Sequence, residues 1–336
     1  MTAGRAIHLA WLAIPINGYR GGVMLSPTYL ISRLLQMIPT LLLVMVFIFL
    51  LVRMLPGDPA VAMAEAKATD AQIEQIRHAM GLDQPLPVQF GYFVKNTLTG
   101  NLGTSILLKQ PVASVILQRL PTTVALGVYA VLLATLLAAP LALVAASKPN
   151  GWADVTIRSL FQVGLSAPVF YIGLILLTVL AAKLRLFPVG GYGDTFLQRM
   201  HHLFLPAMSV ALYISAIILR NLRASLIDVL DAEYVQFARA KGLPKRVIWT
   251  RHVMKNALVS TVTLLGLSIG NLMSGTLVTE TVFAVPGLGR LMLEAIYARD
   301  YPLIQALTLT FAVCVSVVFL LTDLVQSWLD PRLRHA

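Results

Sequence analysis

The sequence carries few charged residues. Only 12% of its 336 residues are charged and 57% are hydrophobic, whereas a typical soluble domain has about 25% charged residues. The mean hydropathy is +0.78. This composition excludes a soluble globular protein and predicts an all-α, polytopic membrane protein, because helices satisfy their own backbone hydrogen bonds in lipid. The net charge of +11 flanks the apolar segments, so nucleic acid is not an expected partner and membrane lipid is.

Cysteine and known catalytic motifs are also scarce. The single cysteine, Cys314, lies in an apolar run, which excludes an internal disulfide or a cysteine metal cluster. The chain has no G-x-x-x-x-G-K-[ST] segment for ATP and no His-Glu-x-x-His for zinc. The adjacent His201 and His202 would point in different directions on a helix, so we expect them at an interface. No catalytic residue, metal site or cofactor is therefore expected. Energy from ATP would have to be supplied by a partner, because this chain has no motif to bind it.

Long apolar runs make up much of the chain. Six are free of internal charge and hold about 17–25 residues, the length of a membrane-spanning helix: 34–52, 124–146, 159–182, 203–219, 257–279 and 302–322. Prolines in four of these runs predict kinks or helix ends: Pro39, Pro140, Pro168 and Pro206. Lys and Arg are enriched in the segments on the N-terminal side of the membrane. This enrichment predicts that both termini face the cytoplasm and places Asp323 near the inner headgroups.

Two segments outside these runs also have a predicted character. Residues 1–28 form an N-terminal extension, since the apolar run 7–16 is too short to span a bilayer. The outer segment 56–118 is too long to be a turn. It is predicted to hold two amphipathic helices that pack on the outer mouth of the spans. The first has the capping box Thr69-x-x-Gln72, the stripe Ile73, Ile76 and Met80, and a stop at Gly81; the second has Phe90, Phe93, Val94 and Leu98 and ends at Gly100.

The cytoplasmic segment 220–256 is predicted to be a docking element. Good helix formers run from Ala232 to Lys241, and Tyr234, Phe237 and Ala238 are expected on one face of that helix. Gly242 stands where a left-handed cap belongs, and Pro244 follows it to end the helix. The small residues Ala238, Ala240 and Gly242 would let another surface approach the backbone closely, which a solvated connector does not require.

A ridge of small residues marks the fifth apolar run. Gly266, Gly270 and Ser274 recur every fourth residue, the spacing that lets two membrane helices approach closely. The ridge predicts helix packing. Its partner helix belongs either to this chain or to a second subunit.

Several short motifs, taken together in their order and spacing, carry a family resemblance. From about Leu30 to the end, the chain resembles the permeases of bacterial binding-protein-dependent ABC importers, in the dipeptide/oligopeptide/nickel branch. The motifs are LPGDP (55–59), GLDQPL (81–86), GNLGTS (100–105), ARAKGL (238–243), PGLGR (286–290), RDYP (299–302) and DPRLR (330–334). The chain departs from the family pattern at Gln236, where a Glu is usual, and in the absence of Ile-x-Leu-Pro near His252.

The resemblance implies a type I importer permease domain over 29–336, with six transmembrane helices in the bacterial inner membrane. It implies that 220–256 is a coupling loop that moves with an ATPase, so that the spans alternate between outward and inward access. The residues implied in coupling are Tyr234, Phe237, Ala238, Arg239, Ala240, Lys241, Gly242 and Leu243. The implied partners are a second homologous permease subunit, two cytoplasmic ATP-binding subunits and a periplasmic solute-binding protein.

The expected function is thus ATP-driven import of peptides, with nickel or glutathione as alternative cargoes of the same family. GYG (191–193) is similar to nickel relatives, whereas ARAKGL is commoner in peptide relatives. An ion-coupled secondary transporter is the alternative from a different class, and an intramembrane enzyme is a more distant one. The charge-free spans argue against the secondary transporter, because coupling ions normally require intramembrane polar or charged groups.

Overall fold

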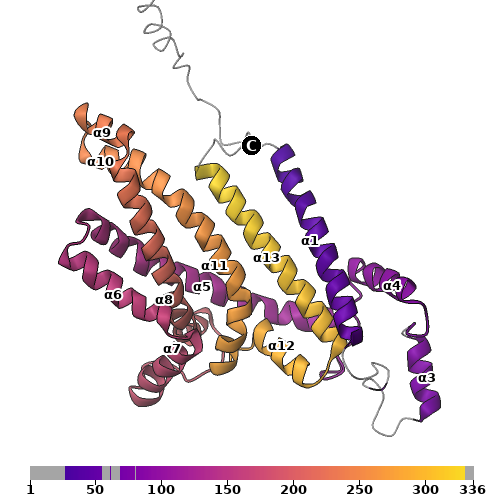
Figure 1. The fold of residues 1–336 in the computed structure, drawn as a ribbon. Coiled ribbons are helices and arrows are strands. Elements are labelled where there is room, and N and C mark those ends of the chain that lie inside the picture. The colour runs from indigo at the N-terminus through magenta and orange to yellow at the C-terminus, as the bar shows by residue number, and fades with distance from the viewer. Residues whose placement is uncertain (1–26, 55–60, 62–68, 80, 330–336) are drawn as a thin grey trace, which may run out of the picture.

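The computed structural model describes residues 27–54, 61, 69–79 and 81–329, and helices dominate this part of the chain (Figure 1). Its helices are α1 (Pro27–Met54), α3 (Asp70–Ala79), α4 (Leu86–Leu98), α5 (Val112–Ser147), α6 (Trp152–Ser166), α7 (Val169–Leu176), the π-helical η2 (Leu177–Lys183), α8 (Phe196–Asp231), α9 (Glu233–Ala240), α10 (Lys245–Val247), the π-helical η3 (Ile248–Val253), α11 (Met254–Val282), α12 (Leu288–Tyr297) and α13 (Tyr301–Leu329). Within the described residues, extended pairing is limited to one isolated bridge between Thr104 and Pro111. The predicted all-α class is confirmed.

Five of the described helices are long and apolar enough to cross a membrane: α1, α5, α8, α11 and α13. The sixth candidate is the pair formed by α6 and the continuous α7–η2 helix, which is bent by 102°. The break lies at Pro168, where the sequence predicts a kink or a helix end. Ala167 is extended, with φ −93° and ψ 136°, because the ring of Pro168 disfavours helical geometry in the residue before it.

The helices extend beyond the apolar runs that predict them. α5 begins at Val112 and α8 continues to Asp231, so parts of the segments 56–118 and 220–256 belong to membrane helices. Hydropathy detects only the apolar part of a helix, whereas the polar turns beyond it stay helical by continuing the same hydrogen-bond ladder. The residues of the extension before Pro27, LPGDP at 55–59 and DPRLR at 330–334 lie outside the described residues.

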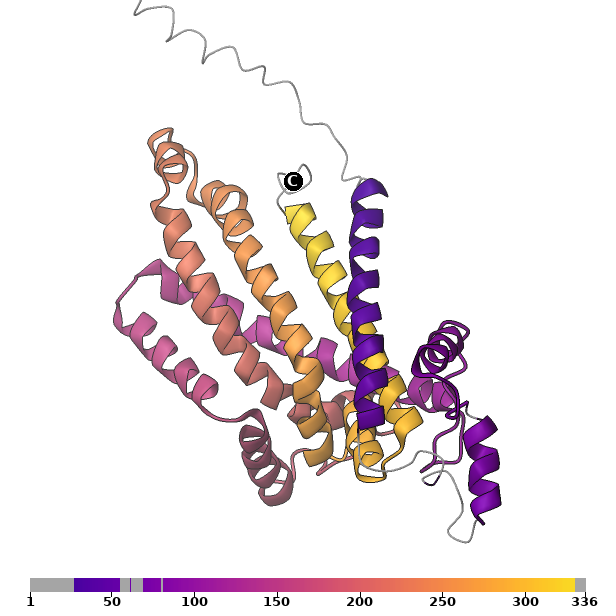
Figure 2. The same cartoon turned by 45° about the vertical axis from the view of Figure 1, so that its right-hand side comes forward.

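Both views place the start of α1, the end of α13 and the α9–α10 turn toward one end of the bundle (Figures 1 and 2). α4 and α12 lie at the opposite end (Figure 1). This arrangement agrees with the predicted topology, in which both termini and the segment 220–256 share the cytoplasmic side.

The core is centred on the contact between α5 and α8. Ala130, Ala134, Ala138 and Ala142 recur every fourth residue of α5 and are fully buried. Their small side chains let α8 approach closely, and large α8 residues such as Leu222 and Leu226 fill the same core. The alanine ridge went unnoticed in the sequence because alanine is common in apolar runs and does not stand out as glycine does.

The outer segment packs in part as predicted: Phe90, Phe93 and Val94 contact the outer core, whereas Leu98 is 79% exposed. Met80 and the side chain of Ile76 lie outside the part of the chain that the structure describes. Thr69 and Gln72 form the expected capping box at the start of α3, and Gly81 is left-handed with φ 66°. On α4, the ring of Phe90 lies 5.2 Å from that of Phe49 on α1 in an edge-on contact. This contact places α4 against the outer end of the spans.

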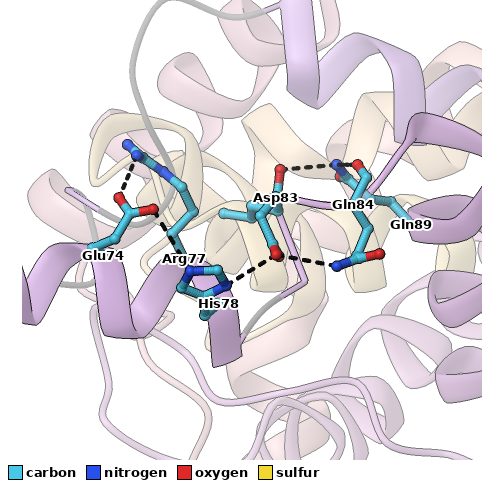
Figure 3. A network of polar contacts seen from close by, with 7 residues as sticks. Glu74, Arg77, His78, Asp83, Gln84 and Gln89 are labelled. Carbon is cyan, nitrogen blue, oxygen red and sulfur yellow. Dashed lines mark hydrogen bonds and ion pairs between the residues drawn. The ribbon is translucent and has the colours of Figure 1, made fainter.

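A polar network connects α3, α4 and the turn between them (Figure 3). A ring nitrogen of His78 lies 2.9 Å from the Asp83 carboxylate, which also accepts a 3.1 Å hydrogen bond from Gln84. Gln89 on α4 donates to the Gln84 carbonyl at 2.7 Å. The side-chain oxygen of Gln89 accepts a 2.7 Å hydrogen bond from Arg53 at the end of α1. The network fixes the outer helices to the first span.

Candidate functional site

The strongest site candidate is the cytoplasmic turn formed by α9 and α10. α9 ends as the sequence predicts, because Gly242 adopts a left-handed conformation with φ 75°. The Leu243 N–H donates to the Ala238 carbonyl at 3.3 Å, and the Gly242 N–H donates to the Arg239 carbonyl at 2.9 Å. This pair of bonds is a Schellman cap. Pro244 then opens α10, so the turn has a fixed geometry.

The inner face of α9 packs on the rest of the chain. Val235 is fully buried and Ala238 is only 5% exposed, and both belong to the main core. The outer face carries Tyr234, Phe237 and Leu243, which are 45%, 61% and 39% exposed. The expectation that Ala238 shares a face with Tyr234 and Phe237 was therefore wrong. Ala238 supports the helix from within, and its small size lets α9 lie close to its own bundle.

We define the tip surface as Tyr234, Phe237, Lys241 and Leu243. The Lys241 ammonium lies 4.6 Å from the centroid of the Phe237 ring, within the range of a cation–π contact. The exposed side chains around the tip include Arg239, Ala240, Lys245 and Arg246. The surface thus combines an aromatic centre with a cationic rim, which fits a partner whose docking groove is apolar and whose edge is acidic.

The tip is tied to the two long helices that leave it. Asn256 on α11 donates to the Tyr234 hydroxyl at 2.9 Å. The hydroxyls of Ser225 on α8 and Ser260 on α11 lie 2.7 Å apart, and Asn221 on α8 donates to Thr261 at 3.3 Å. Gln236, which replaces the family's Glu, donates to the Asp231 carbonyl at 3.0 Å. A force applied to α9 would therefore act on α8 and α11 together.

The small-residue ridge of α11 faces α13 of the same chain. A Cβ at Gly266 would overlap Thr322, and one at Gly270 would lie 3.1 Å from the Phe319 ring. The side chain of Ser274 lies outside the described side chains. Of the two partners that the ridge left open, the structure places a helix of this chain against both glycines.

A buried carboxylate at the outer end was missed in the sequence. Glu280 is fully buried in the last turn of α11 and accepts a 2.7 Å hydrogen bond from Thr123 on α5. The Arg290 N–H also donates to it at 3.0 Å. A Cβ at Gly287 would overlap this carboxylate, which gives PGLGR a structural explanation. The available signal was an acidic residue directly after the apolar run 257–279.

Two other motifs meet at the same end. Ser105 of GNLGTS donates to the buried Asp300 carboxylate of RDYP at 2.5 Å. The Leu107 N–H donates to the same carboxylate at 3.0 Å. These motifs hold the outer segment onto the start of α13 and therefore serve architecture.

The remaining polar candidates also have structural partners. His201 contacts the Leu186 carbonyl at 3.1 Å and His202 contacts the Gly190 carbonyl at 2.9 Å. They hold the loop before α8. The described residues include no group of His, Cys, Asp or Glu that could hold a metal ion. Asp323 pairs with Arg33 of α1 at 3.3 Å near the cytoplasmic ends of their helices.

Comparison with known proteins identifies the family. Residues 138–335 match the family described as the binding-protein-dependent transport system inner membrane component, and residues 24–127 match its N-terminal part. The chain is 41% identical over 307 residues to a glutathione transport system permease protein of Pectobacterium atrosepticum, covering 91% of this chain and 99% of the relative. It is 37% identical over 310 residues to a probable peptide ABC transporter permease protein of Sinorhizobium fredii, with the same coverage.

A solved structure shares the fold. The inward-facing MetNI methionine ABC transporter matches with a TM-score of 0.53 at 13% identity, covering 64% of this chain and 96% of that chain. The match supports the type I importer permease fold over the shared part. With the two family regions and the full-length relatives, it establishes that this chain belongs to the inner-membrane permease subunits of binding-protein-dependent ABC importers, as a multi-pass transport subunit.

Proposed function

We propose that the tip surface docks on an ATP-binding subunit and transmits its movement to the membrane helices. The observation that carries this proposal is the exposure of Tyr234, Phe237 and Leu243 on a capped helix at the cytoplasmic end. Aromatic side chains in a fixed position make strong contacts, because little side-chain entropy is lost when they bind. The exposed apolar area of this surface would be removed from water when it binds in an apolar groove, which favours docking.

The remaining partners follow from the family and from the two ends of the molecule. We infer an assembly with a second homologous permease subunit, two cytoplasmic ATP-binding subunits and a periplasmic solute-binding protein. The solute-binding protein would release cargo at the outer end, where α3, α4 and α12 lie (Figure 1). The ATP-binding subunits would drive the spans between outward and inward access.

The inferred cargo is a short peptide, with glutathione included in that class. Identity of 41% to a glutathione permease and 37% to a probable peptide permease over nearly the full chain supports this class. Nickel remains the alternative cargo within the family. The ion-coupled alternative is not adopted, because similarity to ABC transporter permeases supports ATP as the energy source.

The docking proposal can be tested with a matched pair of aromatic substitutions. Phe237→Ser removes the centre of the tip surface, and Phe196→Ser removes a phenylalanine that is 75% exposed at the opposite end of the bundle. Loss of a central aromatic contact costs about 2 kcal/mol or more, which is roughly a thirtyfold loss of affinity. We expect Phe237→Ser to lose ATP-binding subunits on purification and Phe196→Ser to retain them. Equal retention would overturn the docking role.

The cargo can be tested in proteoliposomes that hold the complete importer with its solute-binding protein. Glutathione and unmodified dipeptides should stimulate ATP hydrolysis and accumulate in the lumen, whereas Ni²⁺ should do neither. Stimulation by Ni²⁺ alone would replace the peptide assignment with the nickel one.

A further inference from the structure

The contact that joins α6 to α8 is a buried ion pair. Asp154, in the first turn of α6, is 0% exposed. Arg223 on α8 donates two hydrogen bonds to the Asp154 carboxylate, from Nε to Oδ1 at 2.5 Å and from Nη2 to Oδ2 at 2.6 Å. The Asn150 N–H donates to Oδ2 at 2.8 Å, and Arg158 approaches Oδ1 at 3.2 Å. Such a bidentate ion pair fixes both the distance and the angle between two helices.

The apolar contacts of α6 with the main core are only partly buried and come from Ile157 and Phe161. Asp154 is the only residue of this helix that is buried, and large apolar side chains such as Leu160 and Val163 are exposed along it. At its other end, a Cβ at Gly164 would lie 3.4 Å from the Leu212 carbonyl of α8. The ion pair is therefore the fully buried attachment of α6, and it lies at the cytoplasmic end of this helix.

The location of this pair connects the tip to the bent span. Arg223 lies in the cytoplasmic half of α8, the helix that leads directly into α9, while Asp154 begins the helix that leads into the 102° bend. Both views show α6 beside α8 (Figures 1 and 2). When α8 moves with the tip, Asp154 must follow, since separating the two charges would leave a carboxylate buried without its main partner.

We propose that the Asp154–Arg223 ion pair carries the movement of the coupling helix α9 from α8 to α6 and the bent α7–η2 segment. This proposal rests on the proposed docking function of the tip. Asp154 and Arg223 are positioning residues, because they touch neither the cargo nor ATP. Their role is to make α6 and α8 move as one body at the cytoplasmic end.

The decisive variant replaces both charges by amides, Asp154→Asn with Arg223→Gln. Removing both partners avoids an uncompensated buried charge, so the complex should assemble and hydrolyse ATP as the wild type does. If the ion pair served only to stabilise the fold, this double variant would transport as much solute per ATP as the wild type. We expect instead that solute transported per ATP hydrolysed falls by about fivefold or more, the lower end of ordinary coupling between sites.

Two single variants complete the experiment. Arg223→Lys keeps the charge but loses the bidentate hydrogen bonding, so transport per ATP should fall while assembly is retained. It also carries the test if the double variant does not assemble. Arg158→Gln is the control, because Arg158 contacts the same carboxylate from within α6 and cannot join the two helices. It should behave as the wild type.

Wild-type transport per ATP in the double variant, or in Arg223→Lys, would overturn the proposal. The Phe237→Ser experiment reports separately on docking, because it measures bound ATP-binding subunits and not transport per ATP. Failure of the docking function would therefore be recognised by retained subunits in Phe237→Ser, whatever the ion-pair variants do.

Discussion

Substitution of Gly242 gives the sharpest test of how the tip is held. Gly242 has φ 75°, and a Cβ built there meets nothing within 4 Å. A Cβ therefore causes no clash within the chain, and its cost comes from the left-handed backbone. For ordinary side chains this cost is about 1–2 kcal/mol, and a β-branched residue lies at the upper end because its χ1 is restricted.

Gly242→Val and Gly242→Asn form a matched pair. Both add a side chain of similar size in the same open space, but asparagine tolerates the left-handed region and often replaces glycine at this cap. A cost of 1–2 kcal/mol lowers the equilibrium constant for forming the docking-competent cap by a factor of about 5–30. We expect Gly242→Val to weaken binding of the ATP-binding subunits by up to this factor, and Gly242→Asn to keep most of the affinity.

The assay is an equilibrium titration of the ATP-binding subunits against the reconstituted permease pair. Wild-type affinity in Gly242→Val would refute the role of the cap. Equal losses in the valine and asparagine variants would show that bulk at the docking surface, and not backbone geometry, causes the effect.

The remaining predictions concern packing and topology. Ala238→Arg should destabilise the tip itself, because Ala238 is buried within its own chain; limited proteolysis should cut the α9–α10 turn faster, and an unchanged cutting rate would count against this packing. Gly270→Leu should force α11 from α13 and cost about 1–3 kcal/mol, lowering the melting temperature of the isolated chain while membrane insertion continues; an unchanged melting temperature would contradict the contact. Gly289→Ala should destabilise the outer end, because its Cβ would lie 2.5 Å from the Leu277 Cα, whereas Gly91→Ala in α4 meets no atom and should be neutral or slightly stabilising. A reporter active only in the cytoplasm should signal between α9 and α10 and stay silent between α3 and α4, and signal from both sites would contradict the topology.

The sequence by itself determined the features that depend on local backbone chemistry and on hydropathy. The capping box at Thr69, the left-handed cap at Gly242 and the helix end before Pro244 follow from the conformations that single residues allow. The membrane class follows from long charge-free runs, because a bilayer demands length and apolarity wherever a helix is placed. The family followed from motifs whose order no single local rule explains.

The tertiary structure decided which neighbour each surface meets. Tyr234 and Phe237 share the outer face of α9 but Ala238 points inward, a difference set by where α8 and α11 place the helix. Gly266 and Gly270 predict that another helix packs closely, and only the packed bundle shows that this helix is α13. Pro168 indicates a break, yet its 102° angle depends on the surfaces that α6 and α7 find. Asp154 and Arg223 are 69 residues apart, and pairing over that distance is a property of packed helices, which sequence periodicity does not encode.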